Sequence, residues 1–203
     1  MLHELSGDNA EITSRLDRIG RCGVPNYFGD QRFGRDNIDQ SLAYLRGERK
    51  VRRGNQGMML SAARSLLFNA VLSERVRLSN WDMALPGDVM MLDGTSSVFS
   101  IDEVTDDIID RCNRHDIHPT GPLFGKGGKR PGVIVDAIEA CAIAPYHEFA
   151  EGLLGQDIDA SRRSLRLCPA DLKWSFTDCG VGVEFFLPSG GYATSVIREI
   201  ASV

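Results

Sequence analysis

The sequence lacks any apolar run close to the roughly 20 residues that a helix needs to cross a bilayer. Its first residues, Met1 to Gly7, also lack the basic start and the apolar stretch of a signal peptide. Hydrophobic residues make up 42% of the 203 positions and charged residues 25%, a balance typical of a folded protein. We therefore expect a cytoplasmic protein without a membrane partner, built from one domain or one domain plus part of another.

The cysteines form no C-x-x-C pair, and their number is odd. They are scattered over the chain at Cys22, Cys112, Cys141, Cys168 and Cys179. This pattern favours reduced thiols over disulfides or a zinc site. Cys112, His115 and His118 are spaced three apart, but the segment offers no fourth ligand, and His118 precedes Pro119 in an expected loop. We therefore predict no metal site.

The sequence also lacks the positive net charge that is typical of nucleic-acid-binding domains, because its formal charge is −5. The charges are unevenly distributed: residues 32–64 contain eight Lys and Arg against three acidic residues. Such a stretch can bind phosphates, and its candidate residues are Arg32, Arg49, Lys50, Arg52 and Arg53. The alternative is a solvated loop and helix face without a ligand, which charge alone favours.

Apolar residues recur at helical spacing over much of the chain. This periodicity predicts helices over residues 6–22, 37–46, 60–78, 102–114, 133–144, 146–167 and 192–200, the sixth of them broken near Gly155. Alternation predicts short strands within 86–101 and a hairpin of strands 172–178 and 181–187, joined at Cys179-Gly180. The hairpin is too apolar to stand alone, so either the 86–101 strands complete its sheet or its partners lie outside the chain.

Two loops have a composition that could serve RNA binding. The 26–34 loop is dense in glycine and aromatic residues, so that Tyr27 and Phe28 could stack on bases while Arg32 holds a phosphate or a flipped base. The alternative is a tight structural loop whose aromatic side chains pack into the domain.

The glycine-rich, basic 120–132 loop lacks the spacing of a nucleotide-binding P-loop. It is either a mobile loop that touches an RNA backbone or a plain surface loop.

Three stretches of the sequence resemble one family. Residues 26–34 read N-Y-F-G-D-Q-R-F-G, residues 60–69 read L-S-A-A-R-S-L-L-F-N, and residues 187–199 read L-P-S-G-G-Y-A-T-S-V-I-R-E. In this order they resemble the signature loop, the following helix and the C-terminal motif of TruD-type tRNA pseudouridine synthases. The matches are spread over nearly the whole chain, which makes the resemblance specific.

The resemblance implies an α+β fold in which an inserted, mostly helical α+β domain interrupts a mixed-sheet catalytic domain. Residues 1–22 and 168–203 would be pieces of the catalytic domain, and residues 23–167 would be the inserted domain. The partner strands of the predicted hairpin would then lie in a segment N-terminal to Met1.

The resemblance also implies a reaction on tRNA, typically at uridine 13. In the family an aspartate attacks the flipped uridine, the glycosidic bond breaks and the base rejoins through carbon, with no metal or cofactor. That aspartate lies in a Gly-x-Lys-Asp motif, which this sequence does not contain. We expect it before Met1 and assign no catalytic residue here. The uridine-contacting aromatic of the C-terminal motif carries over to Tyr192, and Asn26, Tyr27 and Phe28 are expected to contact RNA.

Three hypotheses about function follow. In the first, the chain is an incomplete pseudouridine synthase that cannot isomerise uridine by itself. In the second, it is a tRNA- or RNA-binding module without catalysis, whose binding weakens steeply as ionic strength rises. In the third, it is a remnant with neither function, which self-associates through unpaired strand edges.

Overall fold

The structure is a computed structural model, and residues 2–3, 8–34, 36–177 and 180–200 are described. Helices and strands are both abundant, so the expected α+β class is confirmed. The α-helices are α1 (Asn9–Cys22), α2 (Asn37–Leu45), α3 (Arg53–Arg77), α4 (Asp106–Asn113), α5 (Val133–Ile143), α6 (His147–Leu154) and α7 (Ala193–Ile200). Two 3-10 helices, η1 (Asp30–Arg32) and η2 (Ala144–Tyr146), complete the helical elements of these residues.

The strands form three small sheets in which every pairing of named strands is antiparallel. The first has the order β1-β9-β8, the second pairs β2 with β7, and the third has the order β4-β3-β5-β6. Their bounds are β1 (Leu2–His3), β2 (Val24–Pro25), β3 (Val89–Leu92), β4 (Val98–Ser100), β5 (Ile117–Leu123), β6 (Ser161–Ser164), β7 (Arg166–Leu167), β8 (Ala170–Thr177) and β9 (Gly180–Phe186).

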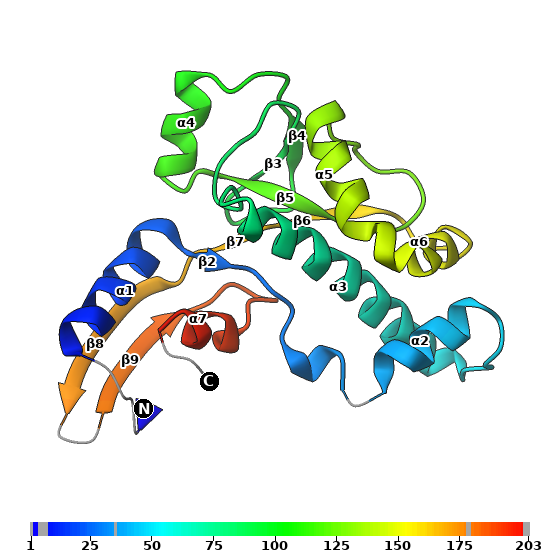
Figure 1. Ribbon diagram of the computed structural model, residues 1–203, viewed down its shortest axis with the longest axis horizontal. Coiled ribbons are helices and arrows are strands. Elements are labelled where there is room, and N and C mark those ends of the chain that lie inside the picture. Colours follow the sequence, from blue (N-terminus) through cyan, green and yellow to red (C-terminus); the bar gives the residue numbers. More distant parts are fainter. Residues whose placement is uncertain (1, 4–7, 35, 178–179, 201–203) are drawn as a thin grey trace.

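The elements gather into two regions that β2 and β7 connect (Figure 1). In one region α1 and α7 pack on the β8–β9 hairpin around a core that includes the fully buried Leu16 and Val196. In the other, α3 packs against α2, α5 and α6 around Leu67 and Leu153, while β3, α4 and β5 enclose a separate cluster. The chain thus leaves the first region through β2 and returns to it through β7.

Most predicted helices are confirmed, with shifted ends. Asp8 caps α1 through a hydrogen bond from the Ala10 amide, at 3.1 Å, whereas the predicted start at Ser6 lies outside the described residues. α3 begins at Arg53 rather than at residue 60, so it includes Gly54 and Gly57. Gly57 disfavours the helix interior by roughly 1 kcal/mol and Gly54 lies in the first turn, while α3 packs against α2.

The prediction of a helix up to residue 167 is wrong beyond α6. The chain instead forms β6 and β7, joined by the buried Leu165, and both residues of β7 are buried as well. The prediction of a loop from residue 120 is also wrong at its start, because β5 extends to Leu123. Pro119 and Pro122 cannot donate to a sheet ladder, which argues against a central strand, yet β5 pairs with both β3 and β6.

The hairpin is confirmed as β8 and β9, and the predicted turn residue Cys179 lies outside the described residues. The 86–101 strands do not complete its sheet: β3 and β4 join β5 and β6, and β1 pairs with β9 instead. The interior strand of this small sheet is therefore β9, and β8 lies at its edge.

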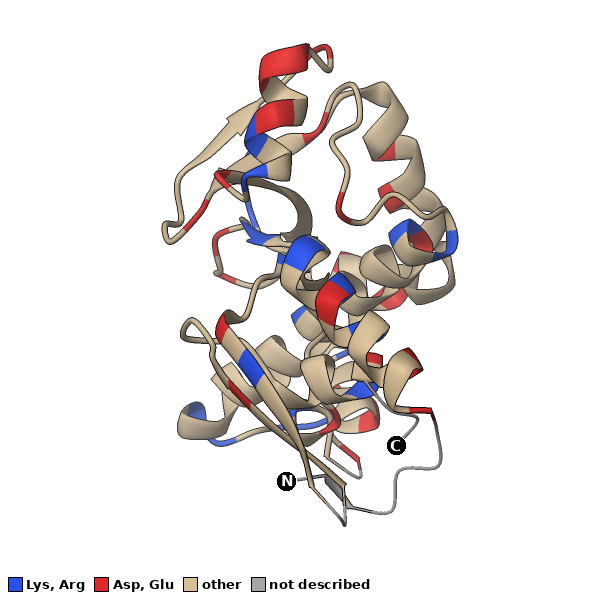
Figure 2. Cartoon of the chain, turned by 90° about the vertical axis from the view of Figure 1, so that its left-hand side faces the viewer, with Lys and Arg blue, Asp and Glu red and all other residues tan. Residues whose placement is uncertain are grey.

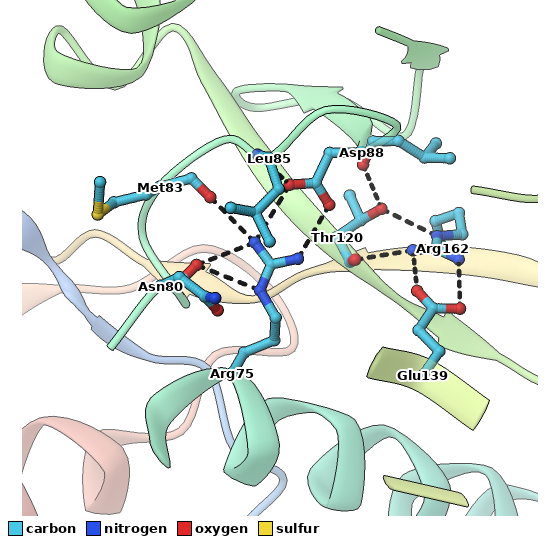
Figure 3. A network of polar contacts seen from close by, with 9 residues as sticks. Arg75, Asn80, Met83, Leu85, Asp88, Thr120, Glu139 and Arg162 are labelled. Carbon is cyan, nitrogen blue, oxygen red and sulfur yellow. Dashed lines mark hydrogen bonds and ion pairs between the residues drawn. The ribbon is translucent and has the colours of Figure 1, made fainter. Parts of the chain in front are cut away.

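A polar network at the end of α3 fixes the third sheet onto that helix (Figure 3). Arg75 is 1% exposed and donates to both carboxylate oxygens of the fully buried Asp88, at 3.0 and 3.1 Å. Its remaining donors reach the backbone oxygens of Asn80 and Met83. Nearby, Arg162 donates to both carboxylate oxygens of Glu139 and to Thr120. Both buried charges are thus paired, as burial requires.

The described cysteines, Cys22, Cys112, Cys141 and Cys168, are all free. His118 lies in β5 rather than in the expected loop, and its ring bonds Asp93 at 2.8 Å and Arg166 at 2.9 Å. Within the described ranges, His, Cys, Asp and Glu form no group of three or more that could hold a metal ion. None of the helices described for this chain is long and apolar enough to cross a membrane.

Candidate nucleic-acid interface

Arg32 links the 26–34 loop to two distant parts of the chain. It is the last residue of η1, and its guanidinium donates to the hydroxyl of Tyr192 at 3.0 Å and to Oγ of Ser61 on α3 at 3.1 Å. The structure therefore brings together two of the residues singled out from the sequence, Arg32 and Tyr192. Ser61 was not predicted to take part.

Phe28 packs against both Tyr192 and the guanidinium of Arg32. It is 8% exposed and packs edge-on against Phe68, with ring centroids 5.4 Å apart, and against Tyr192, at 6.0 Å. The amide side chain of Asn69 holds its backbone from both sides, accepting from the Phe28 N–H at 2.9 Å and donating to its C=O at 3.0 Å. Phe28 is thus a core residue that supports Tyr192. This agrees with the alternative in which the aromatic side chains of the 26–34 loop pack into the domain.

Arg163 completes the cluster from β6, a segment that the sequence pattern had placed in a helix. Its Nη2 donates to Oδ1 of Asn26 at 2.6 Å and to the carbonyl of Gly190 at 2.9 Å. Its guanidinium carbon lies 4.2 Å from the ring centroid of Phe28. Burial, together with the nearby charge of Arg32, lowers the pKa of Arg163 to about 10. No signal in the sequence connects it to Asn26, which lies 137 positions away.

Glycines allow Tyr192 to approach the loop closely. A Cβ added at Gly29 would lie 3.1 Å from Oγ1 of Thr194 and 3.3 Å from the Tyr192 ring. Gly190 has a φ of +84°, a conformation that favours glycine. A larger residue at Gly29 would crowd the Tyr192 ring, and a larger residue at Gly190 would be strained.

The other two loop residues singled out from the sequence do not contact Tyr192 through a described hydrogen bond. Asn26 is 7% exposed, accepts from Arg163 and donates to the carbonyl of Ser164 at 2.9 Å, so it is a structural partner of β6. Tyr27 donates to Oγ of Ser73 at 3.2 Å, and burial raises the pKa of its hydroxyl. Tyr27 also lines a pocket of about 480 Å³ along α3, together with Tyr146 and Cys141.

The basic residues of the loop between α2 and α3 are exposed. Arg49, Lys50 and Arg52 line a separate pocket of about 290 Å³ together with Gln40 and Asn55, and Arg53 is the first residue of α3. None of these four basic residues forms an ion pair with any residue that the structure describes. Elsewhere basic and acidic positions are interspersed along the ribbon (Figure 2). No described contact joins these residues to Tyr192.

Among the described residues, no carboxylate bonds Tyr192 or the two arginines beside it. Asp30, in the same loop, is exposed and pairs with Arg198 on α7. Arg32 and Arg163 have no carboxylate partner in the described part of the chain. In the loop after β5, Lys126 pairs with Asp157 at 3.2 Å. The cluster therefore offers aromatic and cationic groups, which suit nucleic acids, but contains no carboxylate nucleophile among these contacts.

Comparison with known proteins gives concordant results. The family model described as tRNA pseudouridine synthase D (TruD) matches residues 38–200. A tRNA pseudouridine synthase D from Nitrosococcus oceani is 43% identical over 204 residues, which cover 98% of this chain and 57% of that protein. A tRNA pseudouridine synthase D from Xanthomonas campestris pv. campestris is 40% identical over 219 residues, which cover 100% of this chain and 60% of that protein.

The fold has a solved counterpart in the putative tRNA pseudouridine synthase D from Methanosarcina mazei. The TM-score is 0.69 at 18% sequence identity, and the match covers 97% of this chain and 66% of that one. The chain spans about three fifths of the length of the curated relatives it matches. The family match extends over α2 to α7 and includes Ser61, Arg163 and Tyr192. The chain therefore belongs to the tRNA pseudouridine synthase D (TruD) family.

Proposed function

We propose that this chain carries the substrate-contacting part of a tRNA pseudouridine synthase, an isomerase that converts uridine in tRNA, typically uridine 13, to pseudouridine. The observation that carries the proposal is the junction of Arg32, Phe28 and Tyr192, which assembles an aromatic and cationic cluster within a chain of this family. Such a reaction requires an aromatic surface for an extruded base and positive charge for its backbone. A tRNA substrate also favours a cytoplasmic location.

In this proposal Tyr192 contacts the uridine, and Arg32 fixes the orientation of its ring through the hydroxyl. Phe28 and Asn26 act beneath the surface, because both are buried and bonded within the protein. Tyr27 and the basic residues Arg49, Lys50, Arg52 and Arg53 are more exposed and contact RNA away from the reacting base.

We propose that residues 1–22 and 168–203 belong to a catalytic domain and residues 23–167 to an inserted domain. The core shared by α1, α7 and the hairpin supports this division, as does the passage of the chain through β2 and β7. The nucleophilic aspartate of the family lies in a Gly-x-Lys-Asp motif that these 203 residues do not contain. We therefore propose that the chain by itself does not isomerise uridine.

Two measurements on the 203-residue protein test these proposals. Binding of unmodified tRNA should be measured for the wild type and for Tyr192→Ala, with Arg111→Gln as a control on the distant α4. Loss of affinity in Tyr192→Ala alone supports the site, whereas equal affinities contradict it. Incubation with tRNA followed by nucleoside analysis should yield no new pseudouridine, and its appearance would refute the proposed inactivity.

The second candidate function is RNA binding without catalysis. The exposed, unpaired cations around the 290 Å³ pocket favour it, because charges of this kind are free to bind phosphates. Affinity for RNA should then fall steeply between about 50 and 200 mM salt. The double variant Arg49→Gln/Arg52→Gln should show a weaker dependence of affinity on salt concentration. Absence of binding at low salt would contradict this function.

A further inference from the structure

Two half-buried arginines beside Tyr192, Arg32 and Arg163, differ from Arg75 and Arg162 in their partners. Arg75 and Arg162 each bond both oxygens of a carboxylate, from Asp88 and Glu139. Arg32 and Arg163 have only uncharged partners among the residues described: hydroxyls, an amide oxygen and a carbonyl. Neither of these two positive charges is therefore paired with a carboxylate in the described part of the chain.

The two guanidinium groups also have unused donors. Nε of Arg32 and Nε of Arg163 are shielded from solvent and have no hydrogen-bond partner among the described residues. Nε of Arg64 shares this feature, but Arg64 bonds Leu123, Asp159 and Ser161, and no described contact joins it to Tyr192. Arg166 differs, because its Nε donates to His118 and its Nη2 to two backbone carbonyls. A half-buried cation with unused donors favours a partner that brings negative charge.

The two arginines flank the same short segment. Arg32 bonds the hydroxyl of Tyr192, and Arg163 bonds the carbonyl of Gly190, two positions earlier. Because their guanidinium carbons lie 5.5 and 4.2 Å from the centroid of the same Phe28 ring, they are at most about 10 Å apart. An anion that reaches this place therefore experiences both charges and lies next to the aromatic ring of Tyr192.

We propose that Arg32 and Arg163 form the binding site for the phosphate group of the nucleotide whose base lies against Tyr192. Guanidinium groups suit phosphate oxygens because they present several planar donors and stay charged. This inference rests on the proposed function, since it assumes that Tyr192 receives a nucleotide. It adds a role for Arg163, which acts from the inserted part of the chain on the C-terminal segment.

The proposal is tested by comparing uridine 5′-monophosphate with uridine as ligands of the 203-residue protein, by calorimetry or by NMR titration. The wild type should bind the monophosphate about tenfold more tightly, the increment expected for hydrogen bonds to a charged group. In Arg163→Gln this preference should shrink to less than threefold while affinity for uridine stays within threefold. In Arg163→Lys, which keeps the charge, at least half of the preference in free energy should remain.

Arg111→Gln is the matched control, because Arg111 also lies over a phenylalanine ring, 5.7 Å from the centroid of Phe99, but has Asp116 as an acidic neighbour. It should retain the wild-type preference. Inorganic phosphate should bind at least tenfold more weakly than the monophosphate, since it has no base for Tyr192.

Three outcomes would overturn the assignment. These are equal affinities of the wild type for uridine and its monophosphate, an unchanged preference in Arg163→Gln, and inorganic phosphate binding as tightly as the monophosphate. A structural role of Arg163 alone would weaken binding of both ligands equally and leave the ratio unchanged. Failure of the proposed function is distinguishable, because Tyr192→Ala would then leave the affinity for tRNA unchanged and neither uridine nor its monophosphate would bind.

Discussion

The guanidinium of Arg32 donates a hydrogen bond of 3.0 Å to the hydroxyl of Tyr192, across 160 positions of sequence. The bond connects the loop after β2 with the segment before α7, and Phe28 lies under both side chains. A tyrosine at this position therefore differs from a phenylalanine in one respect: its ring is held from its polar end as well as by packing. This relationship leads to the first prediction.

Tyr192→Ala should weaken RNA binding by about 1–3 kcal/mol, the range for loss of stacking on one base. Tyr192→Phe keeps the aromatic face and should bind nearly as well as the wild type. Fluorescence anisotropy with labelled tRNA measures both. Equal losses in the two variants would show that the hydroxyl, and not the ring, determines affinity.

Asp88→Asn should destabilise the fold by about 3–5 kcal/mol, because it leaves the charge of Arg75 buried without its partner. Urea unfolding followed by circular dichroism measures the change. The exposed pair Arg77–Glu74 on the same helix provides a control, and Glu74→Gln should unfold at nearly the wild-type urea concentration. A small effect of Asp88→Asn would contradict the network drawn in Figure 3.

Two glycine substitutions should change stability in opposite directions. Gly87 has a φ of +87°, and an added Cβ would lie 2.8 Å from Cα of Gly132, so Gly87→Ala should cost at least about 1–2 kcal/mol. Gly57 lies inside α3 with nothing within 4 Å of an added Cβ, so Gly57→Ala should stabilise by about 0.5–1 kcal/mol. Thermal unfolding of both variants provides the comparison.

Acidification should destabilise the protein through His118. Burial lowers the pKa of this ring, an effect that Arg166 strengthens and the hydrogen bond to Asp93 opposes. The unfolded chain then takes up a proton at higher pH than the native state does. Stability is therefore fully present above the unfolded value of about 6.5 and is lost as the pH falls below it.

Urea midpoints at pH 7.5 and 5.5 measure this loss. His118→Gln should lose less stability than the wild type over that interval. His147→Gln, at an exposed position, should behave like the wild type. Destabilisation on raising the pH from 5.5 to 7.5 would contradict the direction assigned to His118.

Local periodicity predicted the positions of most helices, but it did not predict the two strands within residues 161–167. Leu165 and Leu167, two positions apart, do not share one face of a helix, but a run this short carries a weak signal, and pairing of β6 with β5 and of β7 with β2 forms the strands. The strand β5 was likewise not predicted, because it contains Pro119 and Pro122. The sequence pattern also placed Arg49, Lys50, Arg52 and Arg53 near Arg32 in a single basic stretch, but the structure gives them a separate surface.

What the sequence alone determined is the family and the presence of Tyr192, Arg32 and Phe28, because the motifs that carry them are contiguous runs of residues. The helices α1, α2, α5 and α7 were equally readable, since each buries one periodic face. Only the tertiary structure decided that Phe28 is a buried support and that Arg163 reaches Asn26 and Gly190. Such contacts depend on how β6 and the C-terminal segment meet, and no local pattern encodes a distance between residues far apart in the chain.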